Sequence, residues 1–279
     1  MQLSPRYDGP PILILDVELA DPSVPLLRQR QRLADGLGAL DAAQWAHPSR
    51  CAGWSAQDVI LHLEATNRFW AASIAAGRKG EPTRYLTGFD PVASPAQMVE
   101  AARGTSPAEV LDRFVASNGA LATAIDGLDD DGWATITAEA PPGHISLHGV
   151  ALHALWDSWV HERDVLLPLG LAVVEEADEI AGCLRYSAAL GPAFLAAAGC
   201  DRTGAYVVEG SGPDVHLVVE VGATARVHDG DAPAAAPRLT GRSVDLLEGL
   251  SFRAPLQVDV PDADSWMFGG LAAVFDRPS

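Results

Sequence analysis

The sequence predicts an α+β protein in which a bundle of long helices, residues 1–199, precedes a small domain, residues 200–279, with an antiparallel sheet. Two observations carry this prediction. Apolar residues recur at helical spacing through the first two-thirds of the chain, whereas after Gly199 short β-branched segments alternate with glycine-rich turns. The length of 279 residues exceeds the commonest domain size, which favours two domains over one.

The first two long helices follow from leucine spacing and from a capping signal. Four leucines between residues 22 and 41 recur near helical spacing, and Pro25 suits a first helical turn. Ser55 and Asp58 form a capping-box pattern, because the serine oxygen can accept from an early amide while the aspartate suits the positive helix end. The sequence predicts that this second helix runs to about Ala76.

Serines also mark the expected starts of three further helices. The segment SPAQ from Ser94 predicts a short helix to about Ala102, and SPAE from Ser106 predicts a longer one through Leu128. Ser146 is expected to cap the helix that carries the chemistry discussed below. Long amphipathic helices with modest connections are typical of a bundle.

The remaining segments complete the two predicted domains. EAPPGHIS, residues 139–146, is expected to be a loop, and a last helix at about 175–198 is expected to close the bundle. In the second domain, AYVVE, VHLVVEV and TARVH predict an antiparallel meander. GRSVDLLEGLSF is expected to be helical, PLQVDV to be a strand, and ADSWMFGGLAAVF to be a terminal helix.

Composition and charge narrow the classes of function. The formal charge of −18 and the pI of about 4.6 would repel a phosphate backbone or an anionic bilayer, so neither nucleic acid nor membrane is an expected partner. Three scattered cysteines do not form a disulfide framework or a Cys-x-x-Cys pair. The apolar run 12–15 is shorter than a signal-peptide core, so we expect a cytoplasmic protein.

The segment ALHALWDSWVHERDV, residues 151–165, places titratable residues in an apolar helix. His153, Asp157 and His161 are four residues apart, so they form one slowly drifting stripe on the helix surface. An ionised carboxylate buried among leucine and tryptophan side chains is costly unless it is paired or binds a metal. A carboxylate and an imidazole at this spacing can bind one divalent ion together.

One helix rarely completes a metal site, and His62 is the candidate for the third ligand. It lies at the edge of the apolar stripe of its own helix. Three nitrogen and oxygen ligands leave a fourth position open, which is the arrangement of catalytic zinc. A hydrogen-bonded core histidine and a simple helix pair of Asp157 with His161 are the alternatives. Residues 162–164 are expected to form a solvated helix end.

The segment AQWAHPSRCAGWSAQDVILHLEATNRFW, residues 43–70, resembles the signature of mycothiol-dependent maleylpyruvate isomerases and their DinB-like relatives. The residues that carry this resemblance are Trp45, Cys51, Gly53, Trp54, Ser55, Asp58, Val59 and His62. A second family mark corresponds to Asp157, His161, Asp164, Leu169 and Gly170. LTGRSVDLLEGLSFR, residues 239–253, is similar to the second domain of the family.

The resemblance implies a DinB-like four-helix bundle that binds a divalent metal, zinc first among the candidates, through His62, Asp157 and His161. Asp157 stands where the family has glutamate and is one methylene shorter. The helices would therefore have to approach more closely, or His153 or His148 would ligate instead with Asp157 as its hydrogen-bond partner.

The resemblance also implies the chemistry. A metal deprotonates a thiol, so an open metal position suits mycothiol as a cosubstrate held as thiolate, used for isomerisation or for S-transfer to an electrophilic small molecule. Arg253 corresponds to an arginine of the family's second domain and is the catalytic candidate for binding a substrate carboxylate, with Arg242 and Arg68 as alternatives. Cys51 is interpreted as a small packed residue rather than a nucleophile.

Two rival functions remain at this point. The same fold could carry a thiol-independent, metal-dependent enzyme of a biosynthetic pathway. It could also be a non-catalytic binding module, for which the aspartate in place of glutamate is the best argument.

Overall fold

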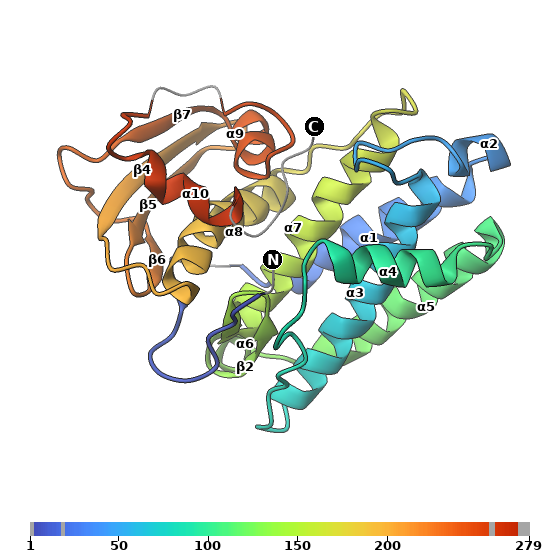
Figure 1. Cartoon of the computed structure of the whole chain (residues 1–279), viewed down its shortest axis with the longest axis horizontal. Coiled ribbons are helices and arrows are strands. Elements are labelled where there is room, and N and C mark those ends of the chain that lie inside the picture. The colour runs from blue at the N-terminus through green and yellow to red at the C-terminus, as the bar shows by residue number, and fades with distance from the viewer. Residues whose placement is uncertain (1–2, 18–19, 257–259, 273–279) are drawn as a thin grey trace.

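The computed structural model describes residues 3–17, 20–256 and 260–272 and confirms the α+β fold. Figure 1 shows a lobe of long helices beside a lobe built on a sheet. The elements are β1 (Leu13–Asp16), α1 (Ser23–Gly38), α2 (Ala42–Trp45), α3 (Ala56–Gly77), α4 (Ala93–Ala102), α5 (Pro107–Ile125), α6 (Asp130–Thr135), β2 (Thr137–Ala140), β3 (Gly143–Ser146), α7 (Leu147–Leu166), α8 (Ala177–Ala197), β4 (Gly204–Ser211), β5 (Val215–Val221), β6 (Ala225–His228), β7 (Arg238–Arg242), α9 (Ser243–Leu250), the 3₁₀ helix η1 (Ser265–Phe268) and α10 (Gly269–Ala272).

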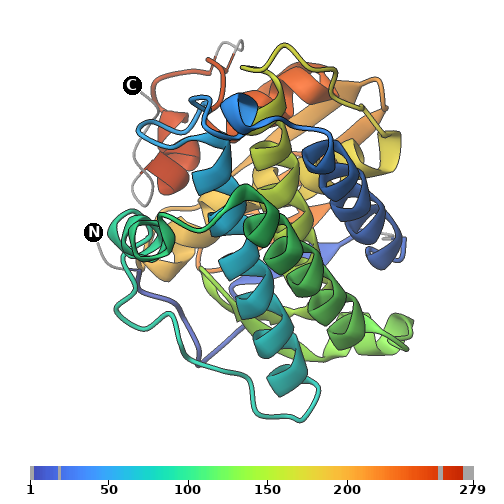
Figure 2. The same cartoon turned by 90° about the vertical axis from the view of Figure 1, so that its right-hand side faces the viewer.

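Helices α1, α3, α5 and α7 form the helical lobe, where α3 packs on both α5 and α7 and α1 packs on the same two helices (Figure 2). Leu33, Val59, Leu63 and Phe114 are at most 1% exposed and belong to the core between these helices. Each such side chain contributes about 1.5–3 kcal/mol by leaving water. This burial holds α3 against α7, which positions the candidate ligands.

Most of the expected caps are present. Ser55 and Asp58 make the reciprocal capping box that starts α3, and Ser106 and Ser146 accept from the third amide of their helices. The cap expected at Ser94 is wrong, because α4 begins one residue earlier and Asp90 accepts from the first amides of that helix. An aspartate ahead of the serine offers a carboxylate to the same orphan donors.

Two connections differ from the expectation. Helix α5 ends at Ile125, and a separate helix α6 starts after Asp129, whose side chain caps it. Residues 139–146 do not form an irregular loop, because most of them belong to the hairpin β2–β3, in which Ala140 pairs with Gly143. Gly143 has a φ of +141° and a backbone atom of Arg6 lies where its Cβ would be, so only glycine fits there.

The main sheet is mixed, with the strand order β1-β6-β5-β4-β7. The antiparallel meander β4–β5–β6 is confirmed. Two further strands make the sheet mixed, because β1 pairs with β6 and β7 pairs with β4 in parallel. Strand β1 comes from the N-terminal segment and thus ties the beginning of the chain to the second lobe.

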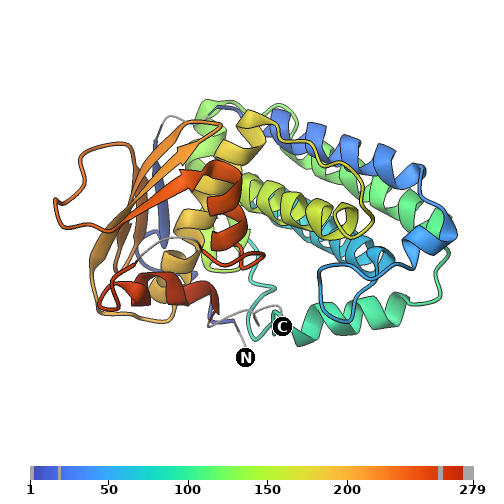
Figure 3. The ribbon, with the colours of Figure 1, turned by 90° about the horizontal axis from the view of Figure 1, so that it is seen from above.

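Helix α8 lies between the lobes and packs on α7, α9, α10 and the strands β5 and β6 (Figure 3). The expectation that this helix closes the bundle is therefore only partly met. It is long and apolar enough to cross a membrane, but 78% of its apolar window is buried within the protein, as in the core helix of a soluble domain. The boundary between residues 199 and 200 remains a proposal.

The expected C-terminal elements are partly outside the described residues. PLQVDV, residues 255–260, includes residues 257–259, which the structure does not describe. The terminal helix begins as η1 and continues as α10 to Ala272, and its expected end lies in the undescribed residues 273–279.

Candidate metal centre

The metal candidates lie where α3 and α7 face each other. His62 on α3 contacts His161 on α7, with ring centroids 5.0 Å apart. Two turns along α3, Trp70 contacts His153, which lies two turns back along α7, with centroids 4.8 Å apart. The two helices are therefore antiparallel, and residues 62–70 of α3 face residues 153–161 of α7. Asp157 lies between the His62–His161 contact and the Trp70–His153 contact.

The three donor atoms converge as a metal site requires. Asp157 Oδ1 lies 3.8 Å from His62 Nε2 and 3.6 Å from His161 Nε2, and ligand atoms of all three residues lie within 4.8 Å of one another. Tetrahedral zinc with bonds of about 2.0–2.1 Å places its ligand atoms about 3.3 Å apart. The Asp157 oxygen is therefore within about half an ångström of the zinc spacing to each imidazole, and this donor set fits a divalent metal.

Asp157 is prepared as an anionic ligand. Burial alone would raise the pKa of its carboxyl group, but the nearby imidazoles of His62 and His161 lower it well below the usual range. Its other oxygen, Oδ2, accepts a hydrogen bond of 3.3 Å from the Thr66 hydroxyl. Thr66 thus holds the carboxylate while Oδ1 points at the two imidazoles.

Asp164 orients the ligand His161. Its Oδ2 lies 2.9 Å from His161 Nδ1, which fixes the proton on Nδ1 and leaves Nε2 for the metal. Burial lowers the pKa of His161, but the charge of Cys51 and the hydrogen bond to Asp164 raise it to about 10 in the metal-free protein. Metal binding would therefore release a proton from His161.

Asp164 is also the centre of an ion-pair network that joins the lobes. Arg253 donates from Nε and Nη2 to both carboxylate oxygens at 2.9–3.0 Å, and Arg50 donates from Nε at 2.9 Å. Glu248 on α9 accepts from Arg50 at 2.8 Å and from Arg163 at 2.6 Å. The C-terminal lobe thus contacts the residue that orients a candidate metal ligand.

The expected solvated end of α7 is wrong. Glu162 is 2%, Arg163 8% and Asp164 0% exposed. Each is buried because a partner from a distant segment covers it, as Arg32 does for Glu162. A run of charges at a helix end usually faces water, and nothing local in the sequence reveals these partners.

Cys51 belongs to the same surroundings. Its Sγ lies 3.2 Å from Asp164 Oδ2, 3.6 Å from His161 Nδ1 and 3.9 Å from Arg253 Nη2. Cys51, His161 and Asp164 form a second group of possible ligands that shares His161 with the first. The half-buried thiol is therefore not merely a packed side chain.

Comparison with known proteins identifies the family of the chain. Residues 26–166, half of the chain, match the profile of the mycothiol maleylpyruvate isomerase N-terminal domain. The chain belongs to this family. None of the curated proteins compared with the chain matches it.

Solved structures confirm the fold beyond the matched residues. The mycothiol-dependent maleylpyruvate isomerase superposes with a TM-score of 0.53 at 15% identity, and a histidine-to-alanine mutant of that enzyme with 0.58 at 14%. Each comparison covers 86% of this chain and 94% of the other. The family's two-lobed fold thus extends over most of this family member.

The alternative ligands lie elsewhere in this family member. His153 Nδ1 forms a 2.6 Å hydrogen bond with the Tyr186 hydroxyl, and burial lowers the pKa of its ring to about 4. His148 lies in the first turn of α7 beside Trp133. Neither ring joins the donor groups found among the described residues.

The three arginines predicted as candidates for substrate binding lie in different surroundings. Arg253 lies at the candidate site, as described above. The alternatives Arg68 and Arg242 are largely exposed and pair with Glu64 and Glu175.

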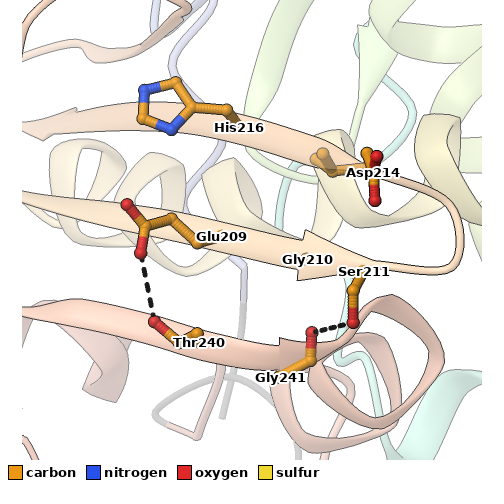
Figure 4. Close-up of a pocket in the computed structure, with 8 residues that line it drawn as sticks. Glu209, Gly210, Ser211, Asp214, His216, Thr240 and Gly241 are labelled. Atoms are coloured by element: carbon orange, nitrogen blue, oxygen red, sulfur yellow. Dashed lines mark hydrogen bonds between the residues drawn. The ribbon is translucent and has the colours of Figure 1, made fainter.

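The second lobe has a separate hollow of about 450 Å³ over β4, β5 and β7 (Figure 4), and the residues that line it do not include the metal group.

Proposed function

We propose that this chain is a metal-dependent enzyme that binds mycothiol as a thiolate at His62, Asp157 and His161. Its reaction would be the isomerisation of an electrophilic acid such as maleylpyruvate, or transfer of the thiol to an electrophilic small molecule. The convergence of three ligand atoms, within a family of mycothiol-dependent isomerases, carries this proposal. Two imidazoles and one carboxylate leave a fourth position for the thiol.

A bound divalent metal would supply the positive charge that keeps a thiol deprotonated at neutral pH. The chain's own residues set up the rest. Asp164 holds the proton of His161 on Nδ1, and Thr66 holds one oxygen of Asp157. These contacts keep the ligand atoms oriented before the thiol arrives, so little reorganisation is required.

Arg253 is the residue that we assign to substrate binding. Its Nε and Nη2 donate to Asp164, and its Nη1 donates to none of the described residues. The guanidinium lies next to Cys51 at the edge of the candidate site, and a carboxylated substrate could receive a hydrogen bond from Nη1. The acidic surface otherwise repels such a substrate, which gives this cation its role. A low-molecular-weight thiol cosubstrate accords with a cytoplasmic location.

Metal content tests the first part of the proposal. Protein purified without chelator should contain about one equivalent of zinc or another divalent metal, and His62→Ala should lose it. His216→Ala is the matched control, because this histidine is exposed on the sheet of the second lobe. Wild-type protein that neither retains nor binds a divalent metal would contradict the proposal and favour a binding module.

Mycothiol binding tests the second part. Cobalt-substituted protein should develop a sulfur-to-cobalt charge-transfer absorption when mycothiol is added, and the His62→Ala protein should not. Metal-loaded enzyme should then convert electrophilic acids only in the presence of mycothiol. Equal turnover with and without the thiol would refute the thiol-dependent function and favour a thiol-independent metal enzyme.

A further inference from the structure

A second cavity, of about 650 Å³, lies between the N-terminal segment, α6 and the start of α7. Residues 6–17 form one wall and lead from a bridge between Arg6 and Gly143 into β1 of the sheet. His148, in the opposite wall, precedes Asp157 by nine residues, which is about 14 Å at the rise of an α-helix. The cavity is therefore separate from the metal group.

His148 is a buried polar side chain without a partner in this cavity. It is 9% exposed, and none of the described residues hydrogen-bonds its ring, which contacts the edge of Trp133 at a centroid distance of 6.2 Å. Burial lowers the pKa of this imidazole to about 4, so at neutral pH the uncharged ring has one N–H donor and one acceptor nitrogen. Neither ring nitrogen is fully enclosed, so both can bond to a ligand in the cavity.

The charges of the lining favour a cation. Asp21 and Asp130 line the cavity, and both are near enough to His148 to act on its pKa. Arg185 acts on that pKa in the opposite direction but does not line the cavity. The lining cation Arg6 directs Nη1 and Nη2 to the carbonyls of Ala223, Pro10 and Pro11, and its buried Nε has no partner among the described residues.

Part of the remaining lining is apolar, beside polar residues such as Tyr7, Thr135 and His144. Leu13, Trp133 and Ile145 are 2–6% exposed and line the same cavity as the two carboxylates. Cavities of this size with an apolar lining and a few convergent polar groups are typical of small-molecule sites. An indole beside carboxylates is also a favourable surface for an organic cation.

We propose that this cavity binds a small organic amine with an apolar or aromatic body. The ammonium group lies near the carboxylates of Asp21 and Asp130 and donates to the acceptor nitrogen of His148. The apolar body packs on Trp133 and Ile145. This site is independent of the proposed metal chemistry.

Titration calorimetry on the full-length protein tests the proposal with 2-phenylethylamine as the probe. The matched uncharged probe is 2-phenylethanol, and the matched anion is 3-phenylpropionate. We expect the amine to bind about tenfold more tightly than the alcohol, which is the size of one charge-assisted hydrogen bond, and the anion to bind more weakly still. An amine that binds no more tightly than the alcohol would overturn the proposal.

Substitutions locate the site. The double variant Asp21→Asn and Asp130→Asn changes exposed side chains, and we expect it to lose about tenfold in amine affinity. The matched double variant Asp112→Asn and Asp231→Asn removes two exposed charges elsewhere and should leave the affinity unchanged. Equal losses in both proteins would mean that only the net charge matters, which contradicts a built site.

The His62→Ala variant separates this inference from the proposed function. It should bind the amine as the wild type does, even though it is expected to lose the metal. An amine titration that fails in His62→Ala but succeeds in the wild type would place the amine at the metal centre and refute the separate site.

Discussion

Replacing Asp157 by glutamate tests whether this carboxylate is a direct metal ligand. In the structure Asp157 Oδ1 lies 3.8 Å from His62 Nε2 and 3.6 Å from His161 Nε2, only about 0.3–0.5 Å beyond the separation in a tetrahedral zinc site. An added methylene moves the oxygens by about 1.5 Å, which is about three times the existing misfit. The hydrogen bond from Thr66 would also be lost.

We therefore expect Asp157→Glu to lower the metal affinity about 10- to 100-fold, or about 1.4–2.7 kcal/mol. Asp157→Asn keeps the shape but removes the charge, and it should lower the affinity at least as much. Competition titration against a chromophoric chelator measures both. Thermal unfolding of the metal-free proteins is the control, because a loss of fold would also lower the apparent affinity.

The opposite result would refute this reasoning. If Asp157→Glu binds metal as tightly as the wild type or more tightly, the helices are spaced for glutamate, and the geometry described here is not the ligating one. If Asp157→Asn keeps the metal and His153→Gln loses it, His153 is a ligand and Asp157 only supports it.

Three other substitutions test the surrounding contacts. Asp164→Asn should weaken metal binding about tenfold and lower the free energy of unfolding by about 3 kcal/mol, because the buried carboxylate pairs with two half-buried arginines and orients the His161 ring; chelator competition and urea unfolding measure the two effects. Burial lowers the pKa of His153 to about 4 from an ordinary 6.5. The contribution of the uncharged ring to the free energy of unfolding is therefore complete above pH 6.5 and is lost as the pH falls through 4. Urea unfolding at several pH values should show that His153→Gln removes about 3 kcal/mol of this pH dependence. Glu139→Ala should cost about 3 kcal/mol, because Glu139 is 0% exposed and accepts from Tyr7 and three further donors, and limited proteolysis should then cut the N-terminal segment faster.

The fold was predictable where its signals are local. Ser55 and Asp58 are three residues apart, and a reciprocal hydrogen bond over that distance depends only on the helix they start. The pairing of Leu13 with Ala225 is a different case, because the partners are more than 200 residues apart. The apolar run 12–15 is short and has no turn that would fix a neighbour, so its place beside β6 could not be read from the sequence.

The candidate site likewise combines contacts that are local in the sequence with contacts between distant segments. Asp157 and His161 are one turn apart on one helix, so their proximity follows from helix geometry alone. His62 was a candidate from its place at the edge of an apolar stripe, and the resemblance pointed to the same residue. The partners of Asp164 come from residues 50 and 253, on either side of α7 in the sequence. Their meeting depends on how the C-terminal lobe packs on the bundle, which no local pattern encodes.

The same ion pairs bear on which of the two candidate ligand groups would hold a metal. Both groups use His161, but Asp164 already accepts from Arg50 and Arg253. A dication about 5 Å from a guanidinium is repelled by roughly 7 kcal/mol at an effective dielectric of about 20, and a metal at Cys51 would face two such cations. Asp157 has two imidazoles and the Thr66 hydroxyl beside it, and the buried guanidinium of Arg30, which also acts on Asp157, donates to the carbonyl of Ala154 rather than to the carboxylate. We therefore expect a metal to bind at Nε2 of His161, with the Nδ1 side left to the proton that orients the ring.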